Sequence, residues 1–506
     1  MLTVHAKSVC IVTTIPLQEQ LNKPNTTYVI KETIDLKGNT LIMPAFSVLR
    51  FGKDGSIKNG TIQGDKTNVR PTRNNVFRNC VIMGSWNVKC AYSSMFDNDL
   101  DAMLLLKNLS CLSTFVKLSS KRNYHINASE ELINVENLES DGIVKPVIKF
   151  HTTDPNVSGI RICGRNIRLH NLIIEDDYKP SNDAIYGPNN ATIGNTIAIL
   201  SRNGTDILTI DNCDFRGGTS SSWVASSQTR NCFVKNCTFT GYMADHGVYC
   251  SMKAETFRVE SCTIIDVTHV SGLFKVRTSD RLRSFSIRNV AAHNYNGYLA
   301  MVSLLETPEA VVTLDHITIT KDTDNNSVFY GFCMNDETKN LKGRGYNASR
   351  ISITNCNFGY GYDGNSVIYA GAGKSVCVKE VVYNKVDVKE SNFGGGCSNR
   401  ISVSNSIFNE CSGDKGISLC TKELIIKTSK MNNRKVSNCL FLVNYDNDFM
   451  QKLSLQNVEI EANTNTLISI AGGDQIGLLL RGCNFIKPLR EIYTASARCR
   501  VDYIKK

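Results

Sequence analysis

Short runs of alternating apolar and polar residues recur along most of this chain. In the octet LTIDNCDF, Leu208 and Ile210 are apolar, and beyond Asn212 the apolar positions are Cys213 and Phe215. Such alternation predicts a strand with one buried face. At Asn212 the alternation changes parity, which would turn the buried face outward unless the backbone bends there. Because Asn tolerates the left-handed conformation that such a bend uses, we predict a corner between two strands at Asn212.

The same block recurs fourteen times, with Asn at the corner position in ten blocks. The predicted corners are Asn59, Asn79, Asn171, Asn212, Asn236, Ser261, Asn289, His316, Asn355, Glu380, Asn405, Asn438, Asn457 and Gly482. From Asn212 they advance by 24, 25, 28 and 27 residues, a period typical of a solenoid whose repeats stack on one another. We therefore predict an all-β fold, a right-handed parallel β-helix with one such corner in each coil and a ladder of stacked Asn side chains.

The position after the corner predicts a second ladder. It holds cysteine in seven blocks, at Cys80, Cys213, Cys237, Cys262, Cys356, Cys439 and Cys483. Cysteine is small and apolar and therefore suits a tight inward corner, while stacked parallel side chains point in the wrong relative direction for a disulfide. We expect most of the nineteen cysteines to be free thiols. No CxxC pair and no Cys/His cluster with metal-ligand spacing occurs, so we expect no metal site and no cofactor.

The pattern divides the chain into five segments. They are an N-terminal cap or attachment segment (1–24), the N-terminal rungs of the β-helix (25–85), irregular rungs or a side lobe (86–165), the regular β-helix (166–489) and a C-terminal segment (490–506). The pattern is weakest between Asn79 and Asn171. An apolar run that begins at Met103 suits a short helix there.

Composition and charge exclude several classes of function. Hydrophobic residues make up 42% and charged residues 21% of the chain, as in a soluble folded protein. No stretch approaches the ~18 apolar residues that would cross a bilayer, so we expect no membrane insertion. The formal charge of +10 includes no long basic run, and only two Trp are present, so we expect no nucleic-acid partner. The basic excess suits an anionic glycan, and a solvated basic surface explains it equally well.

One stretch of the chain resembles a known family. The segment NTTYVIKETIDLKGNTLIMP from Asn25, with SVLRF from Ser47 and GSIKNGTIQG from Gly55, is similar to the N-terminal rungs of pectin-lyase-like β-helix proteins. More narrowly, it resembles those encoded by phages and prophages of Bacteroidetes, including crAss-like phages. The resemblance covers roughly residues 20–70 and is generic over the later rungs.

The resemblance implies a virion protein, such as a tail spike or tail fibre, that contacts cell-surface polysaccharide outside the cell. Such appendages are often homotrimers or bind other virion tail proteins. Many tail spikes also have a separate attachment domain and a separate trimerisation domain, and this chain departs from that pattern. We therefore expect assembly through the rungs, the short termini or a partner.

A candidate catalytic cluster lies within two successive repeats. It consists of Asp245, His246, Lys275 and Arg277, with Asp266 and His269 between them. The run Asp-His-Gly resembles the His-Gly element of polygalacturonase-type enzymes, and Phe-Lys-Val-Arg resembles their Arg-Ile-Lys. The paired-Asp and Asn-Thr-Asp elements of those enzymes are missing here.

If the cluster is catalytic, its four side chains should point outward from adjacent rungs into one groove. His246 would then serve as acid or base, while Lys275 and Arg277 would hold an acidic sugar. The other interpretation is that these are exposed turn residues that recur once in each coil.

Three functions remain open. They are a virion appendage that binds glycan without cutting it, a spike that is a polysaccharide hydrolase or lyase, and a secreted bacterial enzyme of the same kind. We favour the virion appendage and leave its enzymatic activity open.

Overall fold

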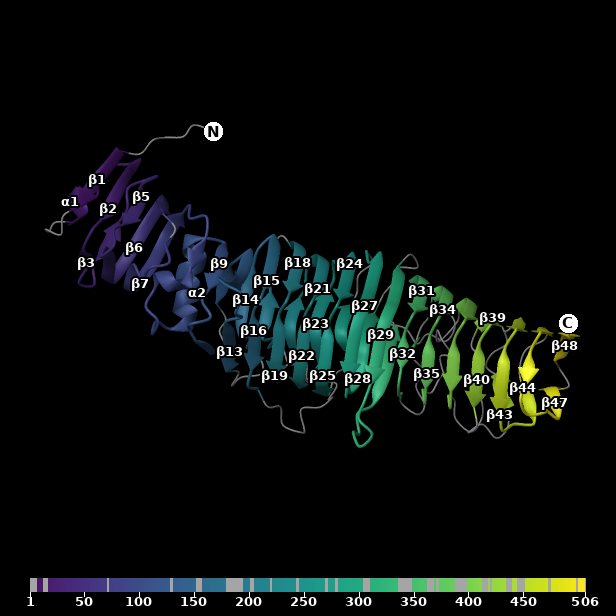
Figure 1. The fold of residues 1–506 in the computed structure, drawn as a ribbon. Helices are drawn as coiled ribbons and strands as arrows, with labels where there is room; N and C mark the ends of the chain where they lie inside the picture. The colour runs from purple at the N-terminus through teal and green to yellow at the C-terminus, as the bar shows by residue number, and fades with distance from the viewer. Residues whose placement is uncertain are drawn as a thin grey trace. The chain divides into compact units, whose positions relative to one another are not determined.

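The fold is known from a computed structural model. It describes all residues except 1–6, 12–16, 71, 128–130, 152–156, 179–193, 201–203, 219–220, 243–244, 269–271, 278–280, 304–309, 335–347, 362–367, 370–372, 387–397, 412–416, 419–420, 434–438, 444–450, 472–474, 497–498 and 506. The chain forms two compact units, Met1–Lys179 with Thr192–Arg216 and Pro180–Ala191 with Gly217–Lys506. We call them the N-terminal and the C-terminal unit. Both are built from parallel strands stacked coil on coil, which confirms the predicted parallel β-solenoid (Figure 1).

The N-terminal unit begins with a seven-stranded sheet and one short helix, α1 (Leu17–Gln20). The strands are β1 (Lys7–Ile11), β2 (Thr26–Ile30), β3 (Thr33–Asp35), β4 (Thr40–Ile42), β5 (Val48–Phe51), β6 (Ser56–Val69) and β7 (Phe77–Trp86). The longest pairing is between β6 and β7, which run parallel with Ile57 opposite Phe77 and Ile62 opposite Ile82. These four side chains are buried, so the apolar positions of the predicted alternation form the buried face of the sheet.

A helix interrupts the coils where the sequence pattern is weakest. After β8 (Ala91–Tyr92) and the 3-10 helix η1 (Ser93–Met95), the apolar run from Met103 lies in α2 (Ala102–Leu112). Asp101 caps this helix by accepting from the Leu104 N–H at 2.9 Å. Asn108 on α2 accepts from the Ile82 N–H and donates to the Cys80 carbonyl, each at 2.9 Å. The helix therefore satisfies backbone groups of β7 that a further strand would otherwise pair.

Three strands make up each coil after α2. In the N-terminal unit they are β9 (Phe115–Leu118), β10 (Tyr124–Asn127), β11 (Leu132–Asn134), β12 (Asn137–Ser140), β13 (Val147–His151), β14 (Ile160–Cys163), β15 (Asn166–His170), β16 (Ile173–Asp176), β17 (Ile197–Ile199), β18 (Thr205–Asp211) and β19 (Asp214–Gly217). Strands three apart in this order pair in parallel, as β15 does with β18, where Leu169 lies opposite Ile210. Each of these coils is thus three strands long.

The C-terminal unit continues the stack of parallel coils, and in two of them one long strand runs through the corner in place of two shorter strands. Its strands are β20 (Ser222–Ser226), β21 (Thr229–Lys235), β22 (Thr238–Tyr242), β23 (His246–Ser251), β24 (Thr256–Glu260), β25 (Thr263–Thr268), β26 (Gly272–Arg277), β27 (Ser284–His293), β28 (Gly297–Ser303), β29 (Val311–Thr320), β30 (Phe329–Met334), β31 (Ala348–Thr354), β32 (Asn357–Phe358), β33 (Ile368–Tyr369), β34 (Gly373–Lys379), β35 (Val382–Asn384), β36 (Ser398–Ser404), β37 (Ile407–Asn409), β38 (Ile417–Ser418), β39 (Thr421–Lys427), β40 (Lys430–Asn433), β41 (Cys439–Val443), β42 (Lys452–Gln456), β43 (Glu459–Ala462), β44 (Thr466–Ile470), β45 (Gln475–Arg481), β46 (Asn484–Phe485), β47 (Glu491–Ala495) and β48 (Arg500–Lys505). The last strand pairs with β45, so the coils continue to Lys505.

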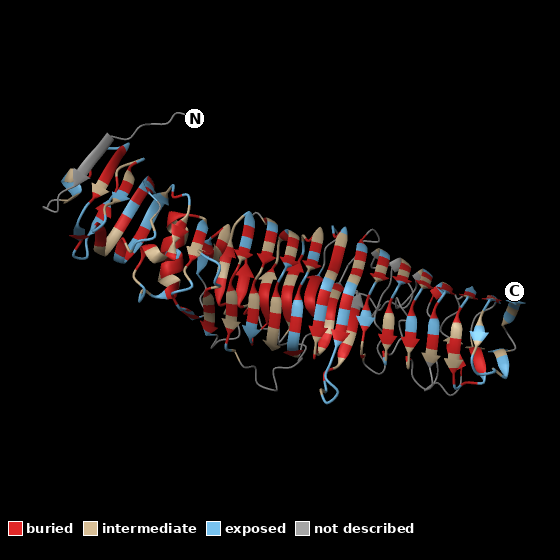
Figure 2. Ribbon diagram, viewed as in Figure 1, coloured by how far each residue is buried: buried red, intermediate tan, exposed pale blue. Residues whose placement is uncertain are grey.

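Buried residues, most of them apolar, recur from coil to coil in each unit (Figure 2). In the C-terminal unit Phe257 stacks on Phe285 with ring centroids 5.4 Å apart, and Tyr383 stacks on Phe408 at 4.9 Å. Aromatic pairs add roughly 0.5–1.5 kcal/mol beyond the area they bury. The core is therefore a column of repeated contacts between neighbouring coils.

The predicted corners are left-handed backbone positions. Among the described residues, φ lies between 48° and 60° at thirteen of the fourteen predicted corners, from Asn59 to Gly482. The N–H of the corner residue donates to the carbonyl before the next corner, as from Asn236 to Glu260 and from Asn405 to Lys427. Because of this backbone bond, the hydrogen bonds between neighbouring coils continue through the bend. The backbone bond does not depend on the side chain, which explains why Ser261, His316 and Glu380 also serve as corners.

Asn side chains stack on one another at some corners. Asn79 donates to Asn59 at 3.2 Å, and Asn212 donates to Asn171 at 3.0 Å. Elsewhere other partners take part: the Asn355 amide donates to the carboxylate of Asp315 at 2.9 Å. The Asn ladder is therefore local, and the continuous ladder is that of the backbone.

One predicted corner is misplaced. Asn438 lies outside the described residues, and Cys439 begins β41, which pairs with β44 in a different sheet from the one that holds the corners. The corner of that coil is Thr428, with φ of 47°. The register between coils places the bend at Thr428. Lys427 lies opposite Ser404 and Gln456, and each of these residues directly precedes the corner of a neighbouring coil.

Several coils also have a second left-handed bend that the sequence pattern did not predict. In the C-terminal unit such bends fall at Gly241, Asp266, Asn294, Lys385 and Glu410, where φ is positive. These residues share no side-chain type, and the apolar alternation stops there. No local pattern therefore marks the second bend.

Six of the seven predicted ladder cysteines follow a corner directly, and Cys439 does not. The Cys213 thiol donates to the Leu169 carbonyl of the preceding coil at 3.6 Å, and the Cys356 thiol donates to that of Leu314 at 3.7 Å. Burial raises the pKa of Cys80, Cys213 and Cys356 to about 12. None of the fifteen cysteines whose side chains the structure describes forms a disulfide. These buried thiols are accordingly unreactive at neutral pH.

Candidate functional site

The predicted catalytic cluster lies on two adjacent strands of the C-terminal unit. Asp245 directly precedes β23, which begins at His246, while Lys275 and Arg277 lie on β26. The two strands pair in parallel, with Tyr249 opposite Lys275. His269 lies outside the described residues. The structure therefore brings the four residues onto neighbouring strands.

His246 lies inside the protein. Its exposed fraction is 1%, whereas the Asp245 side chain is 44% exposed. The ring nitrogen Nε2 lies 3.0 Å from Asp245 Oδ2, and Nδ1 lies 3.0 Å from the Gly272 carbonyl oxygen, which can only accept a hydrogen bond. Burial lowers the pKa of His246, and the Asp245 carboxylate opposes that effect. Both ring nitrogens thus contact protein, and neither is open to a polymer.

The two cations of the cluster have different surroundings. Lys275 is 8% exposed, and its Nζ lies 5.6 Å from the centre of the Tyr249 ring, a cation–π distance. Arg277 is exposed and lies opposite Ser251 on β23. His246 and Lys275 are therefore buried, whereas the Asp245 side chain is 44% exposed and Arg277 is exposed. A catalytic role for the four stays a prediction.

The buried His246 should make stability depend on pH. A histidine whose folded-state pKa is lowered stabilises the fold above its unfolded pKa of about 6.5, and this stabilisation is lost as pH falls through the folded pKa. The thermal unfolding midpoint should therefore fall more between pH 8 and pH 5 in the wild type than in His246→Gln. The variant His316→Gln, whose ring is 58% exposed, is the control and should behave as the wild type does. A smaller pH dependence in the wild type than in His246→Gln would show that the Asp245 carboxylate outweighs burial.

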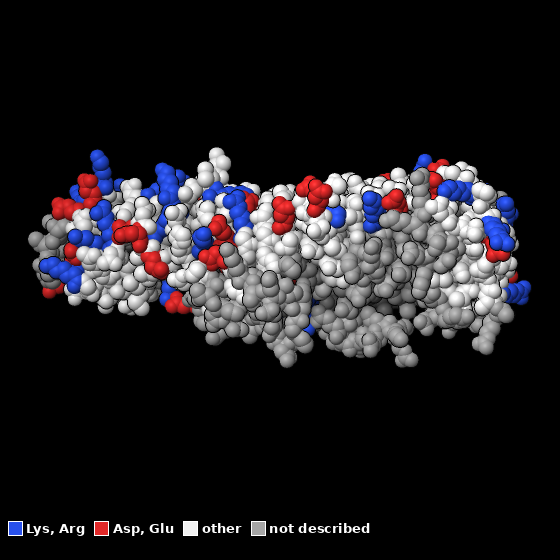
Figure 3. Space-filling view, turned by 90° about the horizontal axis from the view of Figure 1, so that it is seen from below, with Lys and Arg blue, Asp and Glu red and all other residues white. Residues whose placement is uncertain are grey.

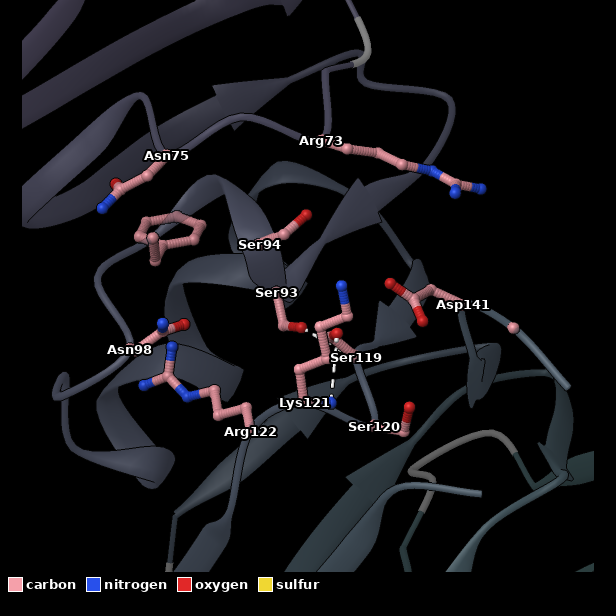
Figure 4. Close-up of a pocket in the computed structure, with 12 residues that line it drawn as sticks. Arg73, Asn75, Ser93, Ser94, Asn98, Ser119, Ser120, Lys121, Arg122 and Asp141 are labelled. Atoms are coloured by element: carbon pink, nitrogen blue, oxygen red, sulfur yellow. Dashed lines mark hydrogen bonds between the residues drawn. The ribbon is translucent and has the colours of Figure 1, made fainter. Parts of the chain in front are cut away.

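A second candidate site is a polar pocket in the N-terminal unit. Its cavity of about 510 Å³ is formed by four connections between elements (Figure 4). These are the β6–β7 loop with Arg73 and Asn75, the stretch from η1 to Asn98, the β9–β10 turn from Ser119 to Arg122, and the β12–β13 turn with Asp141 and Gly142. Because consecutive coils stack, residues up to 69 positions apart in the chain come together in one pocket.

Hydrogen bonds hold the wall of this pocket in place. The Tyr124 hydroxyl donates to Ser93 Oγ at 2.8 Å, and the Ser119 N–H donates to the same oxygen at 2.9 Å. Arg122 Nη1 donates to the Asp97 carbonyl at 2.5 Å, and Nη2 donates to the Leu100 carbonyl. Arg122 is 5% exposed, and its guanidinium carbon lies 5.9 Å from the centre of the Tyr124 ring. The pocket is thus prearranged.

Three polar atoms of the pocket lack a partner. Within the described part of the chain, Asn75 Oδ1, Ser94 Oγ and Arg122 Nε are buried and form no hydrogen bond. Leaving a buried polar group unpaired costs roughly 1–3 kcal/mol, and more when the group is charged. These atoms have almost no accessible surface, so they belong to the wall of the pocket and not to the surface that a ligand would touch.

Charge at the pocket is predominantly positive. The lining residues include Arg73, Lys121 and Arg122 but only one carboxylate, that of Asp141. In Figure 4 the Lys121 side chain extends into the middle of the pocket, with Asp141 on one side and Asn98 on the other. Elsewhere, on the face seen in Figure 3, basic and acidic side chains of the described residues are interspersed.

The sequence analysis missed this pocket. Its residues lie in the segment where the repeat pattern is weakest, and Ser, Asn and single charges in turns are ordinary turn residues. The interruption of the rungs around α2 was the one indication that this segment differs from the rest.

Two further properties bear on function. Among the described residues, no group of three or more His, Cys, Asp or Glu side chains is arranged to hold a metal ion. No helix in the described part is long and apolar enough to span a membrane.

Comparison with known proteins finds a structural likeness to a phage tailspike. No protein-family model matches the chain, and no curated protein matches it. A crystal structure of tailspike protein 3 of bacteriophage CBA120 is similar at 10% sequence identity with a TM-score of 0.34, over 81% of this chain. This chain spans 61% of the length of that tailspike chain. The assignment of the fold rests on the strand pairing described above.

Proposed function

We propose that this chain is a phage virion appendage that contacts host surface glycan through the pocket of the N-terminal unit. The observation that carries the proposal is a polar cavity with a predominantly basic lining, which includes Arg73, Lys121 and Arg122 together with Ser and Asn side chains. Sugar hydroxyls both donate and accept, so a sugar unit can bond to such a mixed lining. A cavity of about 510 Å³ lies within the size range of small-ligand pockets.

The resemblance of the N-terminal rungs to β-helix proteins of Bacteroidetes phages and prophages supports the virion assignment. A long solenoid also suits an appendage, since each coil is stabilised by its neighbours along the whole length. We further propose that the protein assembles as a homotrimer or with other tail proteins. In the C-terminal unit, Ile486 and Ile504 near the last strands are 50% and 51% exposed, which supports burial of that end in an assembly.

The alternative is a polysaccharide hydrolase or lyase. The hydrogen-bonding distance between Asp245 and His246 favours it, because a carboxylate-oriented imidazole can act as acid or base. The 1% exposure of His246 weighs against it. We therefore rank glycan binding without cleavage first.

Binding to purified surface polysaccharides from candidate host strains tests the proposal. Lys121→Gln should weaken binding about 5- to 10-fold, which corresponds to the loss of one polar contact of roughly 1–1.4 kcal/mol. The same variant should unfold no earlier than the wild type, because the Lys121 side chain is exposed. Binding is measured by biolayer interferometry, and Asn68→Ala, an exposed position in β6 outside the pocket, should bind as the wild type does.

Two outcomes would contradict the proposal. Polysaccharide binding that is unchanged in Lys121→Gln would remove the pocket from the binding site. Shortening of the polymer during incubation with the wild type, abolished in the double variant Asp245→Ala with His246→Ala, would establish the enzymatic alternative.

A further inference from the structure

One column of side chains in the C-terminal unit changes its charge pattern along the stack of coils. Its members directly precede the corner of each coil, and strand pairing places each member opposite the next. In four successive coils they are Lys235, Glu260, Arg288 and Asp315. Neighbouring members lie about 4.8 Å apart, so each charge has a charge of the opposite sign beside it. This part of the column is therefore balanced.

Beyond Asp315 the column holds no acid. Cations recur in every second coil, at Lys379, Lys427 and Arg481, and an uncharged residue occupies each coil between them. We call these three residues the basic stripe. Because the earlier coils accept alternating charges at the same position, the stacking of coils does not require this row of like charges.

The basic stripe is not neutralised by its own surroundings. Lys427 and Arg481 are exposed and form no ion pair with another described residue. Lys379 lies 3.2 Å from the carboxylate of Glu380, with both side chains about half exposed, and such a surface pair contributes little. Glu423, on the same strand as Lys427, instead pairs with cations of the two neighbouring coils at 3.4 and 3.1 Å. The stripe is therefore available to an anionic partner.

An uncharged strip runs beside the basic stripe on the same face of the sheet. It lies two residues earlier on each strand and consists of Cys377, Ser402, Ile425, Ser454 and Leu479. Cys377, Ser402 and Leu479 are half-buried, whereas Ile425 and Ser454 are buried. A ligand that lies along the stripe thus meets no acid on this side, and uncharged groups of the ligand can rest there.

The spacing of the cations selects the form of the ligand. Two coils are about 9.6 Å apart along the stack. A polypeptide in the polyproline II conformation has three residues per turn and rises about 3.1 Å per residue, so every third residue returns to the same side after about 9.3 Å. In a β-strand the third residue points to the opposite face. Carboxylates at every third position of a polyproline II segment therefore match the stripe.

We infer that the basic stripe binds an acidic, proline-rich segment of a partner protein, with Asp or Glu at every third residue, in the polyproline II conformation. Proline favours this conformation before binding and so lowers the entropy lost on binding. The inference goes beyond glycan recognition, because the stripe lies in the C-terminal unit and the pocket in the N-terminal unit. Peptide binding and polysaccharide binding can therefore fail separately.

Two synthetic peptides of the same composition test this inference. One repeats Glu-Pro-Pro five times, and the other carries its five Glu in one run followed by the prolines. The run spans only about 12 Å, which reaches two cations of the stripe at most. Binding of the fluorescein-labelled peptides to the full chain is measured by fluorescence anisotropy at low salt. The spaced peptide should bind about 5-fold more tightly, and added salt should weaken its binding.

Two substitutions locate the contact. Lys427→Gln should weaken binding of the spaced peptide about 3- to 5-fold, because it removes the central cation. Lys422→Gln removes the same charge from an exposed position outside the stripe on the same strand and should bind as the wild type does. Ser404→Glu places an acid between two cations, as Glu260 does in the earlier coils, and should remove the preference for the spaced peptide without lowering the thermal unfolding midpoint.

Four results would overturn the inference. Equal affinity for the two peptides would mean that spacing is not recognised. Equal losses in Lys422→Gln and Lys427→Gln would assign binding to the net charge of the unit. A single-stranded oligonucleotide of the same charge that binds as tightly as the spaced peptide would make the stripe a general polyanion site. Polysaccharide binding that falls in Lys427→Gln, while peptide binding does not, would assign the stripe to the glycan.

Discussion

Gly84→Ala is expected to lower the stability of the first coils by about 3–4 kcal/mol. Gly84 lies on β7 with φ of 82°, opposite Gly64 on β6. A Cβ added at Gly84 would lie 2.1 Å from the Gly64 carbonyl oxygen. That oxygen belongs to the backbone of a paired strand and cannot move aside without breaking the ladder. The substitution therefore adds steric overlap to the cost of a left-handed alanine.

Gly38→Ala separates these two costs. Gly38 has nearly the same φ, 84°, but nothing lies within 4 Å of its added Cβ. This variant should lose only about 1 kcal/mol, the cost of the conformation alone. Hydrogen exchange of the β6 and β7 amides measures both variants locally, as a solenoid can unfold in parts. Equal losses in Gly84→Ala and Gly38→Ala would show that the close approach of β6 and β7 is not what requires glycine.

Asn212→Leu is expected to cost about 2–3 kcal/mol in the coils of β15 and β18. Asn212 has φ of 53°, a conformation that costs a branched residue such as leucine about 1–2 kcal/mol. The Asn212 amide also donates to Asn171 Oδ1 at 3.0 Å, and leucine would leave that oxygen, on a residue 8% exposed, without its partner. Both effects act on the same corner, so their costs add approximately.

Asn212→Gly is the matched variant. Glycine accepts the left-handed backbone and loses only the amide bond, so about 1 kcal/mol is expected. Denaturant unfolding followed by hydrogen exchange of β15 and β18 compares the two. If leucine and glycine proved equally costly, backbone conformation would not be the reason for Asn at this corner.

The sequence by itself determined the coil and its first corner. Alternation with period two defines a buried face within a few residues, and the parity change at Asn212 or Asn355 requires a bend at that residue. Both properties depend only on residues that are close together in the chain, so they can be predicted from one sequence. The position after the corner is buried and apolar, and because it also holds Leu172, Val290 and Ile317, cysteine is one of several residues that suit it.

The register between neighbouring coils determined the position of one corner that the local sequence pattern predicted wrongly. An Asn-Cys pair occurs at Asn438 and Cys439 as it does at other corners, yet the bend falls at Thr428, because Lys427 must pair with Ser404 and Gln456. Backbone hydrogen bonds to neighbouring coils outweigh the preference of one side chain for the left-handed conformation.

Tertiary structure alone placed the candidate sites. Repetition predicted that Asp245, His246, Lys275 and Arg277 would lie on adjacent strands, but not that His246 would be buried, because exposure depends on what covers the sheet. The pocket joins Asn75, Ser94, Arg122 and Asp141 from four connections, and their spacing in the chain carries no pattern. Strands obey a local period, whereas turns come together only through the stacking of whole coils, and this is why the sequence predicted the scaffold and the structure supplied the pocket.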